Sequence, residues 1–405
     1  MGIEHTPKEA VDNSSVQPRK PGLRPDNPGS PDQPSRLQSL ARAREPAQSQ
    51  NADEEQVGAV SKDRPAEQGL LAGGAENDDL SAWIAAAEQL LGKPEPTAAD
   101  GEDSANDTEE RIEVAADRLD IPDDLSTVVE YGRPHRTDEG GEKQALPLFD
   151  GIPKREDARQ GALGDCGVIA AMGAVAGKVP DKIQSSVRDN EDGTVTVSLH
   201  ETEFKDGDIA TPTGRILDIT VTKDVPVLAE KPGEAAFARC TNAGVTWPGY
   251  IEKALGAVDE TWPPERGQNP LLGNPAERGY ARLDKGTGAW TQAEILAQLT
   301  GRPACVDRLN TDPGAAADNE AVLTALVESG RPTVVSTVPD FMQRADPRVY
   351  KLRCQHAYEL IGVEDGKALL RNPYGHKHPD PVPIAEFTKH FNSYYAALEG
   401  ETGGG

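Results

Sequence analysis

The chain has 405 residues, of which 27% are charged and only 4% aromatic, and its formal net charge is −26. The acidic balance and the lack of a basic cluster argue against a nucleic-acid-binding protein. No apolar run is long enough to span a bilayer, and the first residues lack the features of a signal peptide. We therefore expect a cytoplasmic protein, or one exported or injected by a non-classical route.

Residues 1–125 contain a single aromatic side chain, Trp83, which is too little apolar surface for a folded core. Residues 51–125 carry 21 acidic against 5 basic residues, so this stretch is expected to be solvated and self-repelling. Apolar spacing predicts short helices over 79–92 and 108–119. We expect a disordered acidic region that is either a self-cleaved pro-region or a segment for docking and delivery, as in a bacterial effector or toxin.

The composition changes near residue 145, where segments with regular periodicity begin. Strand periodicity covers 194–200, 216–227 and 331–338, and helical periodicity covers 247–258 and 319–329. Helices that precede a strand-rich region predict an α+β domain with two lobes over 145–398, followed by a flexible tail over 399–405.

The segment QGALGDC places Cys166 between a glycine-rich turn and an apolar helical stretch. Unpaired N–H groups and the dipole at a helix N-terminus favour a thiolate, so Cys166 is a candidate nucleophile. Its own N–H and the side-chain amide of Gln160 can donate to a developing oxyanion. Taken singly, each of these residues is better explained by packing. The four cysteines of the chain include no CxxC pair, which predicts reduced thiols without a disulfide framework or a zinc site.

A nucleophilic thiol also needs a base and a group that orients the base. His356 lies in a predicted strand, QHAYELIGV, and Asn372 follows the turn EDGK in ALLRNPYG. A two-residue turn puts the two side chains on opposite faces of this hairpin, whereas a three-residue turn or a bulge puts them on one face. A hydrogen-bonded core histidine remains an alternative explanation of His356.

The order of QGALGDC, WPGYIEKA, QHAYELIGV and ALLRNPYG resembles the catalytic core of calpain-type cysteine proteases, a branch of the papain-like fold, over residues 148–396. The resemblance implies a helical lobe that carries the cysteine helix and a β-rich lobe that carries the histidine and asparagine. It implies an endopeptidase acting on protein substrates. In it Cys166 is the nucleophile, His356 the base and acid, Asn372 the orienting residue and Gln160 the oxyanion donor.

The chain departs from this family at Gly167 and at Tyr374, where tryptophan is usual. The aromatic residue in the NPYG turn shields the histidine–asparagine bond from water, and tyrosine does so less completely. These departures favour one alternative, a catalytically inactive calpain-like binding module. Another alternative keeps the chemistry and changes the acceptor, as in transglutaminases and deamidases.

Animal members of the family bind calcium within the core, where it aligns the two lobes. The resemblance implies a calcium site built from the carboxylates of Asp157 and Glu252 and the carbonyl of Gly151. Two carboxylates with carbonyl oxygens suit a hard cation. The alternative is that both carboxylates form ion pairs with basic neighbours such as Arg155. The predicted chemistry itself requires no cofactor.

Overall fold

The computed structural model describes residues 110–258, 278–339, 342 and 344–400. The predicted disordered residues 1–109, the predicted helix over 79–92 and the tail residues 401–405 lie outside the described part of the chain. None of the described helices is long and apolar enough to cross a membrane.

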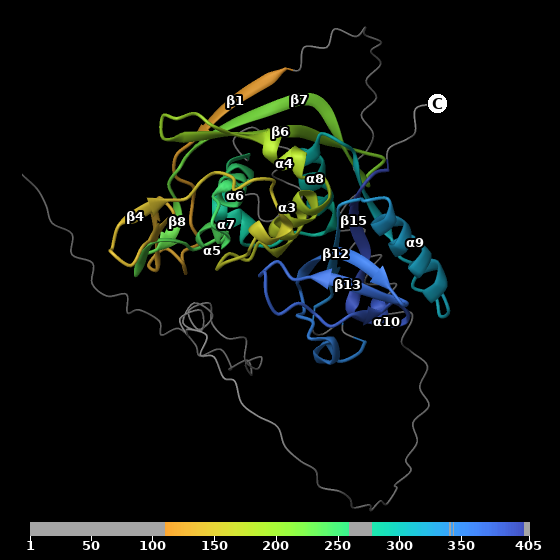
Figure 1. Cartoon of the computed structure of the whole chain (residues 1–405). Coiled ribbons are helices and arrows are strands. Elements are labelled where there is room, and N and C mark those ends of the chain that lie inside the picture. The colour runs from red at the N-terminus through yellow and green to blue at the C-terminus, as the bar shows by residue number, and fades with distance from the viewer. Residues whose placement is uncertain (1–109, 259–277, 340–341, 343, 401–405) are drawn as a thin grey trace, which may run out of the picture. The chain divides into compact units, whose positions relative to one another are not determined.

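The described chain is a mixed α+β structure, with one ten-stranded sheet and two small sheets (Figure 1). The path of the large sheet, from edge to edge, is β14 (Val382–Pro383), β13 (Lys367–Arg371), β12 (Ala357–Glu364), β11 (Thr333–Thr337), β15 (Phe391–Leu398), β10 (Ala304–Arg308), β7 (Ile209–Thr222), β6 (Thr194–Lys205) and β5 (Val187–Asp189). The tenth strand, β1 (Arg111–Ala116), pairs in parallel with β7. The small sheets are β2 (Val129–Gly132), β8 (Val225–Leu228) and β9 (Lys231–Ala235), and β3 (His135–Thr137) with β4 (Lys143–Ala145).

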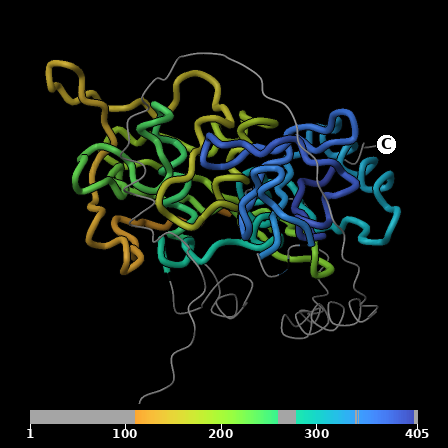
Figure 2. The backbone as a smooth tube through the Cα atoms, turned by 90° about the horizontal axis from the view of Figure 1, so that it is seen from below, coloured from red at the N-terminus to blue at the C-terminus, as the bar shows by residue number. Residues whose placement is uncertain are grey.

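Within the described residues, four helices have eleven to thirteen residues and the others are shorter. The described helices and turns are α3 (Cys166–Lys178), α4 (Pro180–Ser186), α5 (Cys240–Ala243), α6 (Trp247–Ala257), α7 (Gly279–Leu283), α8 (Ala289–Thr300), α9 (Ala316–Glu328), α10 (Ile384–His390) and the 3₁₀ turns η1 (Arg155–Asp157) and η6 (Pro347–Tyr350). Helix α3 is buried continuously over 167–176 and packs against β11, β12 and α8. A helix that is apolar on all sides requires such enclosure. Figure 2 shows its yellow backbone beside the blue C-terminal strands.

Most of the periodic segments form the predicted elements. The segments 194–200, 247–258, 319–329 and 331–338 contain β6, α6, α9 and β11. The predicted strand over 216–227 is divided, because β7 ends at Thr222 and β8 joins another sheet from Val225. Lys253, which is fully buried, donates from Nζ to the carbonyls of Thr222 and Asp224 at 3.1 and 2.7 Å. These two carbonyls therefore face an ammonium group at the break.

The predicted helix over 108–119 is wrong, because residues 111–116 form strand β1. Its side chains alternate between exposed and half-buried positions, as a period of two requires. Pairing with β7 in the register Ile112 to Leu217 and Val114 to Ile219 satisfies the backbone of the segment, which outweighs its weak helical pattern. Residues 110–125 are consequently part of the ordered structure, which starts before the predicted boundary at 145.

The hairpin of β12 and β13 combines a two-residue turn with a bulge. Asp365 and Gly366 form the turn, both with positive φ, between the paired residues Glu364 and Lys367. The register shifts between Leu360 and Gly362. This bulge is the condition under which the two predicted catalytic side chains share a face of the hairpin.

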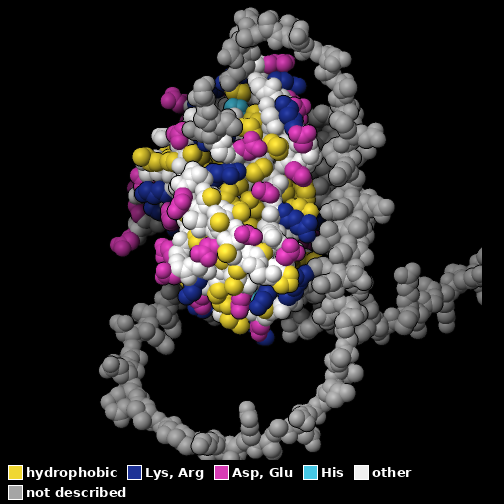
Figure 3. All heavy atoms as spheres, turned by 90° about the vertical axis from the view of Figure 1, so that its right-hand side faces the viewer, with side chains coloured by type: hydrophobic (Ala, Val, Ile, Leu, Met, Phe, Trp, Pro, Cys, Tyr) yellow, Lys and Arg dark blue, Asp and Glu magenta, His cyan; other side chains and the backbone are white. Residues whose placement is uncertain are grey.

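The face on the right-hand side of Figure 1 is drawn in Figure 3 with its side-chain types. Its lysine and arginine side chains are interleaved with aspartate and glutamate around apolar groups. Among the described residues, this face therefore has no patch of one charge that would suit a phosphate backbone.

Candidate active site

Cys166 is the first residue of α3, and Asp165 is the N-cap residue. Cys166 is a half-buried residue, and its sulfur accepts a hydrogen bond from the N–H of Ala357, with 3.4 Å between N and Sγ. Since Ala357 directly follows His356, this contact brings the sulfur next to the histidine. No described residue accepts from the backbone N–H of Cys166, which is expected in the first turn of a helix.

Close packing requires glycine in the turn before Cys166. A Cβ at Gly161 would lie 2.1 Å from the carbonyl oxygens of both Ala236 and Phe237, so only glycine fits there. The N–H of Gly164 donates to Oδ1 of Asp284 at 2.8 Å. These contacts determine where the chain enters α3.

His356 and Asn372 are brought together as predicted. Nε2 of His356 is 3.0 Å from Oδ1 of Asn372, and both side chains are buried, at 5% and 2% exposure. His356 precedes β12 and does not lie inside it, because Gln355 has a positive φ of 48° and the strand starts at Ala357. Nδ1 of His356 has no hydrogen bond to any described residue, so this ring nitrogen is available for proton transfer.

The amide of Asn372 is held in one orientation. Its Nδ2 donates to the carbonyl of Lys377 at 3.1 Å, and its Oδ1 accepts from the N–H of Tyr374 at 3.1 Å. Since Oδ1 can only accept, Nε2 of His356 carries the proton, and Nδ1 has the free lone pair that a base needs.

Aromatic rings enclose the imidazole. Tyr374 stacks on His356 with ring centroids 5.2 Å apart and an interplanar angle of 15°, and Tyr358 meets it edge-on at 5.0 Å. Tyr374 thus occupies the shielding position expected of the aromatic residue in the NPYG turn. Burial lowers the pKa of His356 to about 4, although the bond to Asn372 acts in the opposite direction.

Gln160 is buried against the same turn. Its backbone N–H donates to the carbonyl of Pro373 at 2.8 Å, and its Nε2 donates one hydrogen to the carbonyl of Leu163 at 2.8 Å. The second hydrogen of Nε2 is left for another acceptor. This arrangement is compatible with the predicted oxyanion donor.

The electrostatics of Cys166 differ from the sequence prediction of a lowered pKa. Burial raises the pKa of the thiol to about 11, and the charge of Asp165 adds to this effect. The N–H groups of Ala357, Gly167 and Cys166 itself act in the opposite direction but do not outweigh it. Desolvation of the charged form therefore exceeds the stabilisation from the helix N-terminus.

Gly167, the first departure from the family pattern, has no room for a side chain. A Cβ there would lie 1.8 Å from Oγ1 of Thr287 and 2.9 Å from Nε2 of Gln292. Gln292 in turn donates to Ser336 Oγ at 3.0 Å. A polar cluster of Thr287, Gln292 and Ser336 thus fills the space beside the first turn of α3, where the family usually has an indole.

The two carboxylates that the resemblance assigns to a calcium site, Asp157 and Glu252, each accept a hydrogen bond from a protein N–H group. Asp157 accepts from the Trp247 indole at 3.2 Å and from the N–H of Lys154 at 2.9 Å. Glu252 accepts from the N–H of Ala238 at 3.1 Å. Among the described residues, no three His, Cys, Asp or Glu side chains are grouped so that they could hold a metal ion. Both carboxylates thus have protein donors, and the chemistry proposed for Cys166 and His356 involves no metal ion.

Two buried clusters of ionisable side chains lie beside these residues, and neither cluster was predicted from the sequence. Glu252 lies against Asp165, and burial raises the pKa of both carboxyl groups, that of Asp165 to about 7. Two neighbouring carboxyl groups in a buried place cannot both be ionised without a large cost in free energy. The second cluster surrounds Glu359. An acidic residue in an otherwise apolar strand is unusual, and this signal in the sequence could have revealed the cluster.

No protein-family model matches the chain, and no curated protein matches it. The interpretation of the site therefore depends on its geometry and on the motifs themselves.

Proposed function

We propose that the chain is a cysteine endopeptidase with a calpain-like core of the papain type, in which two lobes meet at Cys166 and His356. One observation carries the proposal. The sulfur of Cys166 lies on the N–H of Ala357, beside a histidine whose Nε2 is held by Asn372 and whose Nδ1 is free. This is the arrangement that a thiol nucleophile with an oriented base requires.

In the acylation step, Sγ of Cys166 attacks the scissile carbonyl carbon while its proton passes to Nδ1 of His356. The carbonyl oxygen becomes an oxyanion that accepts from the Cys166 N–H and from the second Nε2 hydrogen of Gln160. When the intermediate collapses, the C–N bond breaks and the imidazolium protonates the leaving amine. A thioester of Cys166 remains.

Deacylation uses the same groups in reverse. A water molecule gives a proton to Nδ1 of His356 and attacks the thioester carbonyl. The C–S bond then breaks, the sulfur recovers its proton from the imidazolium, and a carboxylic acid leaves. Asn372 keeps the ring oriented through both steps because its Oδ1 accepts from Nε2 whether or not the ring is charged.

The experiment compares wild type, Cys166→Ala and Cys305→Ala on a casein substrate, with products identified by mass spectrometry. Cys305 is another half-buried cysteine, in β10 and outside the site, so its variant is the matched control. We expect chain cleavage by wild type and by the control and none by Cys166→Ala. Cleavage by Cys166→Ala would refute the proposal. Glutamine deamidation or crosslinks without cleavage would identify an acyl transferase instead.

A catalytically inactive binding module is the second candidate, favoured by the raised pKa of Cys166. An epoxysuccinyl peptide distinguishes the two, because ring opening requires attack by sulfur and a proton from the imidazolium. The endopeptidase proposal expects a covalent adduct at Cys166 that His356→Ala abolishes. An absent adduct in the folded wild type supports the inactive module.

A further inference from the structure

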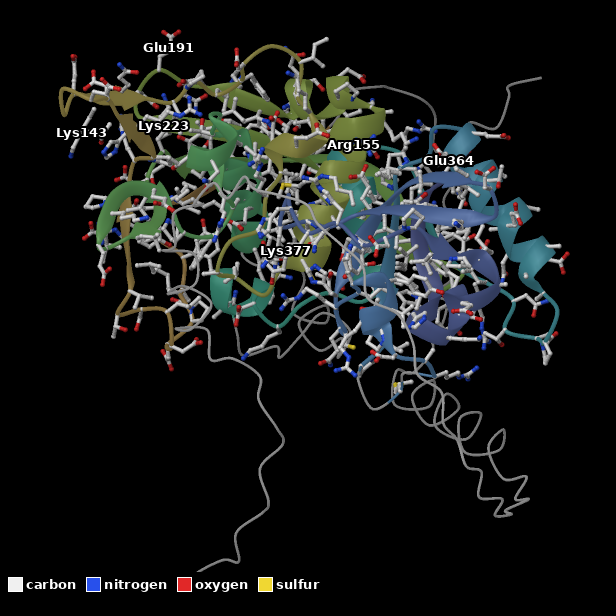
Figure 4. All side chains as sticks on the ribbon, turned by 60° about the horizontal axis from the view of Figure 1, so that its bottom comes forward. Lys143, Arg155, Glu191, Lys223, Glu364 and Lys377 are labelled. Carbon is white, nitrogen blue, oxygen red and sulfur yellow. The ribbon has the colours of Figure 1, made fainter. Side chains whose placement is uncertain are left out.

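Two buried charged side chains and one half-buried one lie between α3 and the hairpin of β12 and β13. Glu359 has a side-chain exposure of 1%, Arg371 of 4% and Arg155 of 21%. Nη1 of Arg155 bonds to Oε1 of Glu359, and Nη1 of Arg371 is 3.8 Å from Oε2. In Figure 4, Arg155 lies where the ribbon of the yellow helix region approaches the blue strands. We call these three residues the charge cluster.

Each arginine also binds a backbone carbonyl of another segment. Nη2 of Arg155 donates to the carbonyl of Gly177 at 3.2 Å, near the end of α3. Nη2 of Arg371 donates to the carbonyl of Ala158 at 2.6 Å, at the C-cap of η1. The charge cluster thus joins η1, α3, β12 and β13 in one network.

Two glycines on one face of α3 provide the space for the guanidinium groups. A Cβ at Gly173 would lie 2.7 Å from Nη1 of Arg371, and a Cβ at Gly177 would lie 2.5 Å from Cζ of Arg155. The spacing of four residues places both glycines on the same side of the helix. Glycine lowers helix stability relative to alanine, so helical preference does not explain either residue, whereas accommodation of the arginines does.

The charge cluster and its partners lie close in sequence to His356, Asn372 and Gln160. Glu359 follows His356 by three residues, and Arg371 directly precedes Asn372. Glu359 of β12 is also the direct cross-strand partner of Arg371 of β13. Ala158, which Arg371 binds, lies two residues before Gln160.

We propose that Arg155, Glu359 and Arg371 are positioning residues that hold the helix of Cys166 in register with His356 and Asn372. This inference rests on the proposed function. Arg155 binds both Gly177 of α3 and Glu359 of β12. A displacement of α3 along the hairpin would therefore break at least one hydrogen bond of the Arg155 guanidinium group. The nucleophile and the base come from different elements, and the charge cluster fixes their relative position.

The electrostatics indicate that alignment, and not stability, is the main effect. Burial raises the pKa of Glu359 to about 7, although Arg155 and Arg371 lower it, with smaller opposing effects of Glu156 and Lys178. A carboxyl whose folded pKa is raised contributes stability that is present at acid pH and lost as the pH rises through about 7. At pH 8 the ionised cluster therefore adds little to folding, as is common for buried ion pairs.

The test replaces the whole charge cluster by apolar residues of similar size, Arg155→Met with Glu359→Leu and Arg371→Met, so that no buried charge is left unpaired. The control, Lys223→Met with Asp189→Leu, removes an ion pair of 2.7 Å that contacts no residue of the site. At pH 8 we expect kcat to fall roughly tenfold to a hundredfold, with KM nearly unchanged and the unfolding midpoint equal or higher. Labelling of Cys166 by the epoxysuccinyl peptide should fall in parallel. The control should change neither.

A folded triple variant with wild-type kcat and wild-type labelling would overturn the inference. If the triple variant does not fold, Gly177→Ala provides the test, because its Cβ displaces only the half-buried Arg155. In that variant, wild-type kcat and labelling would again overturn the inference, and a selective fall in both would support it. If wild type labels at Cys166 but cleaves no substrate, the proposed function fails, while the labelling rates still decide the role of the charge cluster.

Discussion

Asn372→Asp is the substitution that tests most directly how His356 is held. It puts a carboxylate 3.0 Å from Nε2 in place of the neutral amide oxygen. At an effective dielectric constant of about 20, a full charge at that distance stabilises the imidazolium by about 5 kcal/mol, or about 4 pKa units. Burying the new carboxylate offsets part of this gain. We therefore expect the pKa of His356 to rise from about 4 by roughly 2 units or more.

The pKa can be measured by NMR titration of the imidazole in a Cys166→Ala background, which prevents self-cleavage. Asn372→Ala is the control, because it removes the same hydrogen bond without adding charge and so should not raise the pKa. In the active background, the acid limb of the pH–rate profile should move upward with Asn372→Asp. A rise of less than roughly half a unit, within the ordinary spread for histidine, would mean that residue 372 does not face the ring.

Three further predictions concern stability. Because the pKa of His356 is lowered, its contribution to the free energy of unfolding is complete above pH 6.5 and is lost as the pH falls towards 4. The expected loss is about 3 kcal/mol. Urea unfolding at these two pH values measures it, and the loss should be smaller in His356→Gln. Gly167→Trp should lower the free energy of unfolding by about 1–3 kcal/mol through its clash with Thr287, and Thr287→Gly should restore part of it in the double variant. Because Asp157 and Glu252 hold other partners, added calcium should leave the melting temperature unchanged, whereas a specific site would raise it.

Local patterns predicted the elements whose preferences agree with their surroundings. The helices at 247–257 and 316–328 and the strands at 194–205 and 333–337 formed close to their expected places. Residues 111–116 did not, because pairing with β7, a hundred positions away, determined their conformation. The break at Lys223 was also invisible in the sequence, since it depends on Lys253 from a later helix.

In the candidate site too, local motifs revealed some residues, whereas features that depend on distant contacts were not predicted. Cys166 and Asn372 could be singled out because their motifs are local, but the bulge at Leu360–Gly362 that lets Asn372 meet His356 has no clear sequence signal. The charge cluster was missed for a different reason. Arg155 and Glu359 are 204 positions apart, and only burial of both makes the pair notable. Sequence patterns therefore identified groups with chemical roles more readily than the residues that position them.

The ionisation of the two reacting groups determines how the proposed mechanism must proceed. The pKa of Cys166 at about 11 and that of His356 at about 4 are about 7 units apart, so moving the proton from sulfur to imidazole costs about 10 kcal/mol before the charges attract each other. Attraction between the thiolate and the imidazolium offsets part of this cost. The resting pair is therefore a neutral thiol and a neutral imidazole. The proton must move as sulfur attacks, which makes the orientation of Nδ1 by Asn372 a condition of the reaction.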